Sequence, residues 1–596
     1  MLHVFLLGNL YKIFLRLTNN TDLVKNKFSR KLILFLSLVF FIINFIFAIS
    51  CKNIDSPFNL NSEQNDSNFS INSPEDKIED EELFYKFKNS QKEKNPLSNL
   101  NIRQAIFFAI DRERIVQELF GDNNKVLNSF FNETSYFKKS SWSKYSYNPQ
   151  KAKELLSMAG YDADNPLFLT IGAINNSPSR TKIENIIREN FNDVGIELWI
   201  VNKPPNEWYG SILKKGNFEL GIWSLYTFGS GELINYLNSL KIPVNETEEN
   251  KNCSNFYWYK NENIDLMLDK IAKTENIDEL KTYTDEIQEK ISEDAIILPL
   301  FSRMFVVAHK KEINNIQVST IDGNFFKNIE NWTLNETKND QSHSVIIGMS
   351  SEPNTLNPFF EENTSMNYIN SLMVNGLWEL DENAIYQPAL VDEDASQLSE
   401  NEFLNVKKIK LRENIFWENG DPITSDDVKA TVNAILEDKS ILKFKDDYEK
   451  IEKIEIINNK EFEVYFKENI RDWKKLFLYI FPKKDLDQNN LSNLYENYIV
   501  SSGPYKFKEW EKGQHISLTL NANHKISHPF FNEIEIIFNN EENLLIESLE
   551  KGDIDILSLP VDLKLIEEIK ANKKLNLILK ESNLWEHVAI CMKTEE

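Results

Sequence analysis

The chain has 596 residues, of which 41% are hydrophobic and 27% are charged, and its formal net charge is −25. This length exceeds what one compact core holds, so a soluble body of two or three lobes is expected. Because a surface that follows nucleic-acid phosphates needs clustered Lys and Arg, the negative charge argues against nucleic acid as a partner.

Residues 1–51 have the order of an export signal. Basic residues from Lys25 to Lys31 precede an apolar run from Leu32 to Ala48, and small residues lead into Cys51. This order is typical of a secretory signal. The F-A-I-S-C sequence resembles a bacterial lipoprotein processing site, which would make Cys51 the lipid-bearing residue. The alternative is an uncleaved membrane-spanning helix over 32–50. Both interpretations place the body outside the cytoplasm, held at a membrane.

Residues 52–94 are rich in Asn, Ser, Asp, Glu and Lys and contain few apolar residues. Such a segment buries too little surface to offset the entropy lost on ordering. We therefore expect a disordered, flexible tether between the membrane and the body.

The part that follows alternates helical and strand patterns. Helices are expected at 101–121, 148–160, 182–193 and twice within 263–292, and strands at 166–174, 196–201, 218–223 and 295–301. Asn148-Pro149 starts its helix and Gly160 ends it. This alternation predicts an α/β lobe.

The remainder of the chain continues the α/β pattern. Strands are expected at 345–349, 408–411, 454–457, 461–466, 516–520, 534–538 and 554–557, and helices at 425–436 and 543–551. No block occurs twice, so the sequence does not support a tandem duplication.

Six motifs carry a resemblance to a known family. They are N-I-R-Q-A-I-F-F-A-I-D-R (101–112), N-P-Q-K-A-K-E-L-L-S-M-A-G-Y (148–161), D-A-I-I-L-P-L-F (294–301), S-S-E-P-N-T-L-N-P (350–358), W-E-N-G-D-P-I-T-S-D-D-V (417–428) and S-G-P-Y-K-F-K-E-W (502–510). Together they resemble the extracytoplasmic oligopeptide- and dipeptide-binding (OppA/DppA-like, family 5) proteins of ABC importers. The resemblance implies an α/β, periplasmic-binding-protein-like fold of class C, with two lobes and three subdomains.

The order of the motifs departs from that family. A first block, residues 95–336, resembles the family's closing half, and a second block, residues 344–596, resembles its opening half. Joining the end of the second block to the start of the first restores the usual order, so the chain resembles a circular permutant.

The resemblance also implies domain limits. Residues 95–305 would form lobe III, 306–342 would return to lobe I, and 343–596 would form lobes I and II, with lobe II at about 380–500. We expect one covalent hinge crossing near 301–307, with the C-terminus beside the other. Closure would then be looser than with two intact crossings.

The ligand-binding residues implied by the resemblance begin with Gly221–Glu232. The family carries tryptophan, a small residue, aspartate and then tyrosine there, and its aspartate holds the ligand's amino group. Trp223 matches, with Ser224 after it, but Tyr226 stands where the aspartate is expected. Glu232, displaced along the chain, is the candidate to replace the missing carboxylate. For Trp223, the alternative to ligand contact is a position in the core. Losing the carboxylate would remove a strong contact to a peptide N-terminus.

Other candidate ligand contacts lie on separate segments. Glu352, Asn354 and Thr355 would line the cleft rim from lobe I, while Trp585 and His587 would face the ligand near the inferred junction. Arg303 would meet a ligand carboxylate, or else form a surface salt bridge.

Two family motifs have a structural explanation. Asn419 to Pro422 form a tight turn, and Thr424 with Asp427 caps the next helix. The Gly503-Pro504-Tyr505 sequence is likewise scaffold.

No catalytic or phosphate-binding motif occurs, so no enzyme activity and no cofactor are expected. His524 and His528 have a spacing that fits a shared metal, which remains a minor alternative. Cys253 and Cys591 are expected to be free, partly buried thiols, and a single disulfide between them is the alternative.

The favoured function is a monomeric, membrane-tethered solute-binding lipoprotein. It would capture oligopeptides by lobe closure and deliver them to an ABC permease. One alternative is a degenerate surface lipoprotein acting in adhesion or sensing. Another is a gene-rearrangement product whose halves pair between chains as a domain-swapped dimer.

Overall fold

The computed structural model describes residues 74–90, 95–162, 164–227, 229–245, 253–274, 276–335, 343–359, 364–381, 386–392, 405–438, 445–468, 470, 473–488, 491 and 500–593. The chain separates into two compact units, Met1–Asp76 and Lys77–Glu596. The expected signal at 1–51, with Cys51, lies outside the described residues. Within the ranges above, no helix has the length and apolar character needed to cross a membrane.

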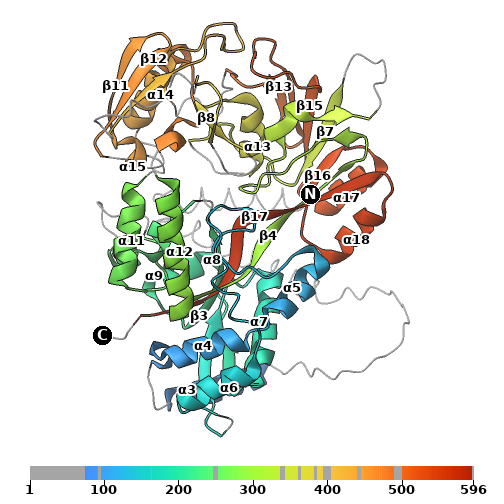
Figure 1. The fold of residues 1–596 in the computed structure, drawn as a ribbon. Coiled ribbons are helices and arrows are strands. Elements are labelled where there is room, and N and C mark those ends of the chain that lie inside the picture. The colour runs from blue at the N-terminus through green and yellow to red at the C-terminus, as the bar shows by residue number, and fades with distance from the viewer. Residues whose placement is uncertain are drawn as a thin grey trace, which may run out of the picture. The chain divides into compact units, whose positions relative to one another are not determined.

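The first block alternates helices and strands, as its patterns predict (Figure 1). Its helices are α4 (Leu100–Ala109), α5 (Arg112–Phe120), α6 (Pro149–Met158), α7 (Pro178–Asn192), α8 (Pro205–Glu207), α9 (Leu213–Lys215), α10 (Glu232–Leu237), α11 (Glu262–Lys273) and α12 (Ile277–Asp294). Its strands are β1 (Leu167–Gly172), β2 (Ile196–Ile200), β3 (Leu220–Tyr226), β4 (Ile297–Lys310), β5 (Ile313–Asn314) and β6 (Thr333–Leu334).

The second block also mixes helices and strands. Its helices are α13 (Thr364–Met373), α14 (Ser425–Glu437), α15 (Lys445–Tyr448), α16 (Lys483–Gln488), α17 (Glu542–Lys551) and α18 (Leu563–Ala571). Its strands are β7 (Ser344–Met349), β8 (Trp378–Leu380), β9 (Tyr386–Pro388), β10 (Val406–Lys410), β11 (Ile451–Asn458), β12 (Glu461–Phe466), β13 (Tyr505–Glu511), β14 (His515–Leu520), β15 (Glu533–Phe538), β16 (Ile556–Leu559) and β17 (Leu575–Ile590).

Strands from both blocks share one sheet. Among the described residues its order is β13-β14-β15-β7-β16-β4-β17-β3-β1-β2. β1 pairs in parallel with β2 and β3, whereas β17 runs antiparallel to both β3 and β4. A smaller sheet has the order β10-β12-β11. This mixed architecture is the expected α/β class.

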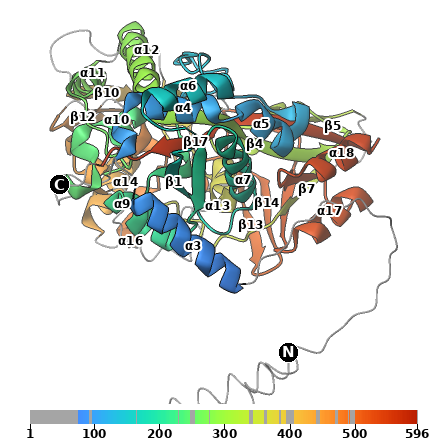
Figure 2. The same ribbon diagram turned by 90° about the horizontal axis from the view of Figure 1, so that it is seen from below.

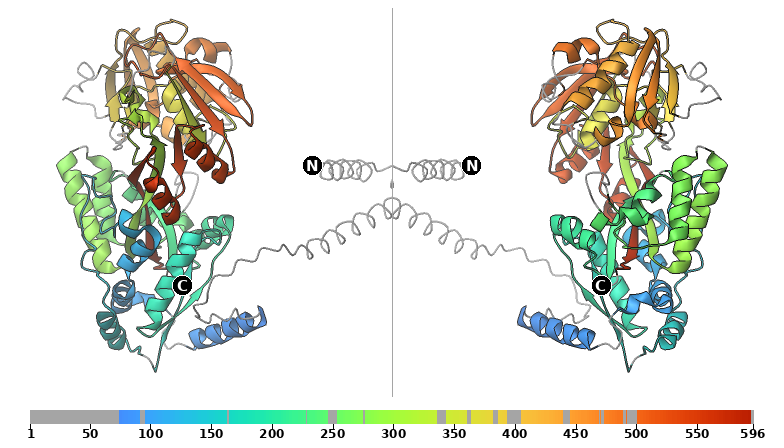
Figure 3. Two further views of the ribbon diagram at one scale, coloured as in Figure 1. Left: turned by 90° about the vertical axis from the view of Figure 1, so that its right-hand side faces the viewer. Right: turned by 90° about the vertical axis from the view of Figure 1, so that its left-hand side faces the viewer.

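Strand β17 is one of the elements that the sequence patterns missed, as are β13, α13 and α18. It pairs with β4 from Leu575↔Lys310 to Ala589↔Ile297, and its last part also pairs with β3 (Figure 3). The expectation of one covalent crossing is therefore wrong, because β4 and β17 are both continuous strands. The predicted loosening of the hinge has no basis in this structure.

The two long strands pass through separate hydrophobic cores. Core 1 holds buried residues between Leu97 and Phe301 together with Trp585, Val588, Ala589, Ile590 and Cys591. Core 2 holds buried residues between Val307 and Ile556, and a smaller third core contains Val306, Ala308 and Leu575. Each of the two strands contributes to more than one core, so the pair connects them.

The end of the second block lies against the start of the first. The Asn95 side-chain amide donates to the Lys593 carbonyl at 3.5 Å. The Met592 amide donates to the Tyr257 carbonyl at 2.7 Å, and the Lys593 ammonium lies 4.5 Å from the Trp258 ring centre. Segments about 500 positions apart in sequence thus meet within the same part of the fold.

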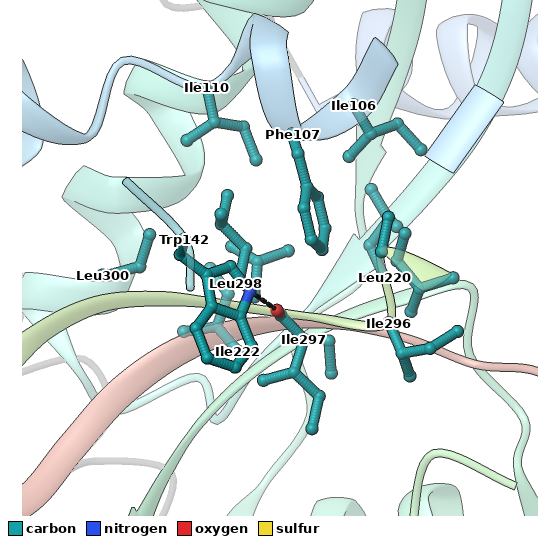
Figure 4. Packing of buried hydrophobic residues seen from close by; sticks show 14 of the residues in the cluster. Ile106, Phe107, Ile110, Trp142, Leu220, Ile222, Ile296, Ile297, Leu298 and Leu300 are labelled. Atoms are coloured by element: carbon teal, nitrogen blue, oxygen red, sulfur yellow. Dashed lines mark hydrogen bonds between the residues drawn. The ribbon is translucent and has the colours of Figure 1, made fainter. Parts of the chain in front are cut away.

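The A-I-D-R motif organises core 1 through a buried arginine. Asp111 caps α5, and the Arg112 guanidinium donates to the carbonyls of Leu127, Pro299, Trp142 and Tyr145 and to the Asn128 side chain. Trp142 in turn donates from its indole nitrogen to the Ile297 carbonyl at 2.6 Å (Figure 4). The motif therefore ties the loop after α5 to β4.

We predict that Arg112→Met lowers the free energy of unfolding by about 3 kcal/mol or more, because several buried carbonyl groups lose their donor. Urea unfolding measures this loss. The exposed Arg188→Met on α7 is the matched control, with an expected effect within about 0.5 kcal/mol. Equal effects of the two substitutions would contradict the assigned role.

The expected disorder of 52–94 is wrong for part of that range, because α3 (Pro74–Asn89) is a helix. Phe84 packs on Phe168 and Trp199, so α3 lies along β1 and β2 (Figure 2). Lys88 forms an ion pair with Glu219 at 2.5 Å. Composition understated the order because two aromatic residues of this polar segment, Phe84 and Phe87, pack on Phe168 of the sheet.

The scaffold interpretation of the second-block motifs is confirmed. Thr424 and Asp427 form a capping box at the start of α14, and Gly420 has the positive φ of +87° that its turn requires. A Cβ at Gly503 would lie 2.5 Å from the Leu372 carbonyl oxygen, so only glycine allows this close approach. Cys253 and Cys591 are free, as predicted, and both are buried.

Candidate ligand-binding site

Three distant segments meet where β3, β17 and β4 lie side by side. Ser224 pairs with Glu586, and Tyr226 pairs with Leu584. Trp585 pairs with Ser302, which precedes Arg303. The structure thereby brings together the candidates on β3, near residue 303 and on β17.

Trp223, Trp585 and His587 are core residues in this structure. All three are buried. His587 accepts or donates a hydrogen bond at 3.1 Å with the Tyr257 hydroxyl, and its ring centre lies 4.7 Å from that of Trp223. Burial lowers the pKa of His587 to about 3, so its ring is neutral. This packing does not fit the expectation that Trp585 and His587 face a ligand. For Trp223, the packing fits the alternative of a core position.

Four polar side chains form what we call the Glu586 cluster: Arg180, Ser224, Arg303 and Glu586. Glu586 is only 1% exposed, and its two oxygens accept from Arg180 at 2.7 Å and from Arg303 at 3.0 Å. The Ser224 hydroxyl donates to Glu586 and accepts from Arg180, both at 3.1 Å. A buried carboxylate is stabilised here by two guanidinium groups.

Arg303 is the accessible member of this cluster. Its side chain is 41% exposed, whereas that of Arg180 is 4% exposed. Arg303 therefore forms a salt bridge, which was the alternative to contact with a ligand. Its partner, Glu586, is a buried residue of β17.

Tyr226 ends β3 beside carboxyl groups from two segments. Burial raises the pKa of its phenol well above the usual value, and the nearby charges of Asp322 and Glu232 add to the effect. Glu232 accepts from the Gly229 amide at 3.0 Å, which ties it to the start of its own helix. Tyr226 is thus neutral and offers no carboxylate at this position.

The pairing of β17 with β4 is interrupted between Glu581↔Met304 and Trp585↔Ser302. At this break the Asn583 amide donates to the Thr320 carbonyl at 2.7 Å, and its own carbonyl accepts from Thr227 at 3.1 Å. The Asn583 side chain accepts from Asn132. Such an interruption in two paired strands is a place where φ and ψ can change, so it is a candidate hinge.

The remaining candidates, Glu352, Asn354 and Thr355, follow β7. Glu352 accepts from the Trp510 indole at 2.7 Å and from the Gly513 amide at 3.0 Å. The Asn354 carbonyl accepts from Lys512, and the buried Thr355 hydroxyl accepts from the Asn357 amide at 3.0 Å. These contacts fix the loop after β7 against the β13–β14 turn.

His524 does not resemble a metal ligand. Its Nδ1 bonds the Ser502 carbonyl at 3.0 Å and its Nε2 bonds the Ser527 hydroxyl at 3.1 Å. The described part of the chain contains no group of three or more His, Cys, Asp or Glu side chains placed to hold a metal ion.

Glu184 lies one turn after Arg180 on α7 and is fully buried. One oxygen accepts from the Asn202 side chain at 2.7 Å. Burial raises the pKa of Glu184 to about 7, and the Asn202 hydrogen bond and the charge of Arg180 limit the rise. Nothing in the sequence pattern indicated this residue, because its burial depends on tertiary packing.

This pKa predicts a pH dependence of stability. The folded-state pKa lies above the unfolded value of 4.5, so stability is full below about pH 4.5 and is lost as the pH rises to about 7. The loss amounts to about 3 kcal/mol when complete. We expect Glu184→Gln to remove this loss and to be more stable than the wild type at pH 8.

Urea unfolding at pH 5 and pH 8 provides the measurement. Glu154→Gln, at an exposed position on α6, is the matched control. The difference in its free energy of unfolding from that of the wild type should change little between the two pH values. If Glu184→Gln behaves like this control, the carboxyl is not held protonated by the fold.

Comparison with known proteins then identifies the family. The family model "Bacterial extracellular solute-binding proteins, family 5 Middle" matches residues 53–246 and 395–595, which together exceed half of the chain. The chain belongs to this family. The recognition made from the six motifs is confirmed, as is the fold class, since the mixed α/β sheet agrees with it.

Curated relatives match at low identity. The oligopeptide-binding protein AppA of Bacillus subtilis is 24% identical over 233 residues, which cover 37% of this chain and 42% of that protein. The glutathione-binding protein GsiB of Pectobacterium atrosepticum is 26% identical over 227 residues, covering 37% and 43%. The chain thus aligns with less than half the length of these relatives.

Solved structures give partial matches as well. NikZ from Campylobacter jejuni in complex with Ni(L-His) is 25% identical, with a TM-score of 0.34, covering 39% of this chain and 45% of that one. AppA from Bacillus subtilis in complex with a nonapeptide is 22% identical, with a TM-score of 0.34, covering 37% and 45%. A family of solute-binding proteins agrees with the expectation that the chain is not an enzyme.

Proposed function

We propose that this protein is an extracytoplasmic solute-binding protein that captures oligopeptides for an ABC importer by lobe closure. The observation that carries the proposal is the pair β4 and β17, which connects two hydrophobic cores and is interrupted at Asn583 beside the Glu586 cluster. A hinge next to a polar site is the arrangement that lets a ligand stabilise a closed form.

The proposed ligand contacts come from both sides of this hinge. Ser224, Tyr226, Glu232 and Arg303 would contribute from the segment around β3 and β4, and Glu352, Asn354 and Thr355 from the loop after β7. Trp223, Trp585 and His587 would support β3 and β17 by packing. Peptide backbone groups bound by β3, with water in the side-chain pockets, would allow varied sequences to bind.

We further propose that the chain is a circular permutant of the family fold. Residues 95–305 form lobe III, 306–342 return to lobe I, and 343–596 form lobes I and II, with lobe II at about 380–500. The contact between Asn95 and Lys593 supports this assignment, because a short link could join them. Each relative aligns over about 37% of the chain. This partial coverage agrees with a permutation, because an alignment that keeps the order of residues can include only one of two exchanged blocks.

Residues 1–51 are proposed as a lipoprotein signal with lipid on Cys51, which would hold a monomeric body at the membrane. The basic flank, the apolar run and the small residues before Cys51 support this proposal. An uncleaved helix over 32–50 would place the body on the same side of the membrane.

One observation favours a second function. Tyr226 is a half-buried, neutral phenol, so β3 lacks a carboxylate for a peptide N-terminus. A surface lipoprotein that has lost transport and acts in adhesion or sensing would tolerate this change. A non-peptide ligand, such as a metal complex, is the other possibility that this site allows.

Ligand capture is tested on the full-length chain purified in detergent. We expect denaturation of the purified protein to release peptides that mass spectrometry detects and that are absent from a mock purification. Calorimetry with a mixed tetrapeptide pool should show saturable binding. Failure to recover or bind any peptide, with the protein folded by circular dichroism, would favour the surface-lipoprotein alternative.

A further inference from the structure

Strands β1 and β2 carry aromatic side chains on the face of the sheet that points away from core 1. Leu167 and Leu169 of β1 lie in core 1. Phe168 and Thr170 alternate with them along the strand and therefore point to the opposite face. Trp199 of β2 is paired with Thr170, so it lies on that same face. An aromatic surface of this kind is stabilised by an element that covers it.

Helix α3 covers this face with two phenylalanine rings (Figure 2). The Phe84 ring centre lies 5.6 Å from that of Phe168 and 5.6 Å from that of Trp199. Phe87 stacks on Phe168 at 5.8 Å. Phe84 is 8% exposed, although it belongs to a polar segment. Because most helix stability in proteins comes from tertiary packing, α3 depends on these contacts for its order.

An ionic contact fixes the position of α3 along the sheet. The Lys88 ammonium group bonds the Glu219 carboxylate at 2.5 Å and donates to the Phe168 carbonyl at 3.2 Å. Glu219 also accepts from the Thr170 amide at 2.8 Å and from the Thr170 hydroxyl at 2.7 Å. The sheet therefore holds this carboxylate in place, ready to accept a charged hydrogen bond from the helix.

The connection after α3 is short, which favours α3 of the same chain as the occupant of this face. The Cys591 amide donates to the carbonyl of Glu219, the partner of Lys88, at 2.9 Å. Asn95, where the first block begins, donates to the Lys593 carbonyl at 3.5 Å. Lys88 and Asn95 are thus both held beside the end of the second block, and the chain between them spans at most about 25 Å.

We propose that α3 is a docked arm that fastens the membrane-proximal part of the chain to the first block. The inference rests on the proposed function, since it takes residues 1–51 to hold the body at a membrane. With α3 docked, the tether ends where α3 begins instead of at residue 94. The first block is then the part of the body that is held, and the second block, joined through β4 and β17, is the part that moves during lobe closure.

Hydrogen exchange measured by mass spectrometry on the full-length chain in detergent tests the docking. Phe84→Ala removes the ring that contacts Phe168 and Trp199, so the amides of residues 81–90 should exchange about tenfold faster or more. Leu83→Ala is the matched control, because Leu83 is 49% exposed on the same helix, and should change the rate less than about twofold. Unchanged exchange in Phe84→Ala, with β4 protected as in the wild type, would overturn the docking.

Charge substitutions test the ionic contact in the same assay. Lys88→Glu places a carboxylate against Glu219 and should also speed the exchange of α3 about tenfold. Lys86→Glu makes the same change at an exposed position of the helix and should have an effect below about threefold. Glu219→Gln keeps an oxygen acceptor for Thr170 but removes the charge, so its effect should be intermediate. Equal effects of Lys88→Glu and Lys86→Glu would overturn the assigned contact.

Energy transfer to lipid measures the role of α3 in attachment. The full-length chain is placed in nanodiscs that contain acceptor-labelled lipid, with a donor dye at Arg188→Cys on α7, and a chain without this cysteine corrects for dye on Cys51. For a flexible chain that starts at residue 52, docking of α3 shortens the r.m.s. reach from about 36 Å to about 26 Å. Adding Phe84→Ala should therefore lower the transfer efficiency, whereas adding Leu83→Ala should not. Equal efficiencies would overturn the attachment role.

The outcomes separate this inference from the function on which it rests. Neither assay uses a peptide, so a failure of peptide capture leaves both results standing. A chain that does not associate with nanodiscs overturns the membrane tether and the attachment role, while the exchange rates still decide the docking. A wild type that sediments as a dimer, with a monomeric Phe84→Ala, would show α3 exchanged between two chains and would overturn docking within one chain.

Discussion

The antiparallel pairing of β4 with β17 is the constraint on which the rest of the structure depends. These two strands carry apolar side chains into more than one core, and they place Arg303 next to Glu586. Hydrogen bonding between strands fixes register, because a shift by one residue would turn each side chain to the other face. The buried charges of Arg180 and Glu586 add to this constraint, since neither can be left unpaired without a large desolvation penalty.

Local patterns predicted most of the α/β elements but not the site. The strands at 461–466 and 534–538 alternate apolar and polar residues and were predictable, as was the capping box of α14. β17 was missed although its first residues, Leu575 to Leu579, are apolar except for Asn576. Charged and polar residues at 580–583 end that apolar run where the strand passes between cores, so the strand pattern weakens at the candidate hinge.

The candidate site shows a similar division. Residues selected by resemblance, such as Trp223 and His587, are packed inside core 1, whereas the ionic cluster depends on Glu586 and Arg180, which no motif indicated. A motif consists of residues that many sequences share, and most such residues stabilise the fold. Arg112 is an example, because it donates hydrogen bonds to buried carbonyl groups. Pairing between residues 406 positions apart is a property of the tertiary fold alone.

The central claim is that the two blocks form one body whose chain order has been exchanged. A reordered chain, with residues 343–596 placed before 95–342 and joined directly from 596 to 95, tests it most directly. The account predicts a monomer in sedimentation that unfolds in one cooperative transition, at a midpoint near that of the natural order. Aggregation, or two independent transitions, would contradict the account.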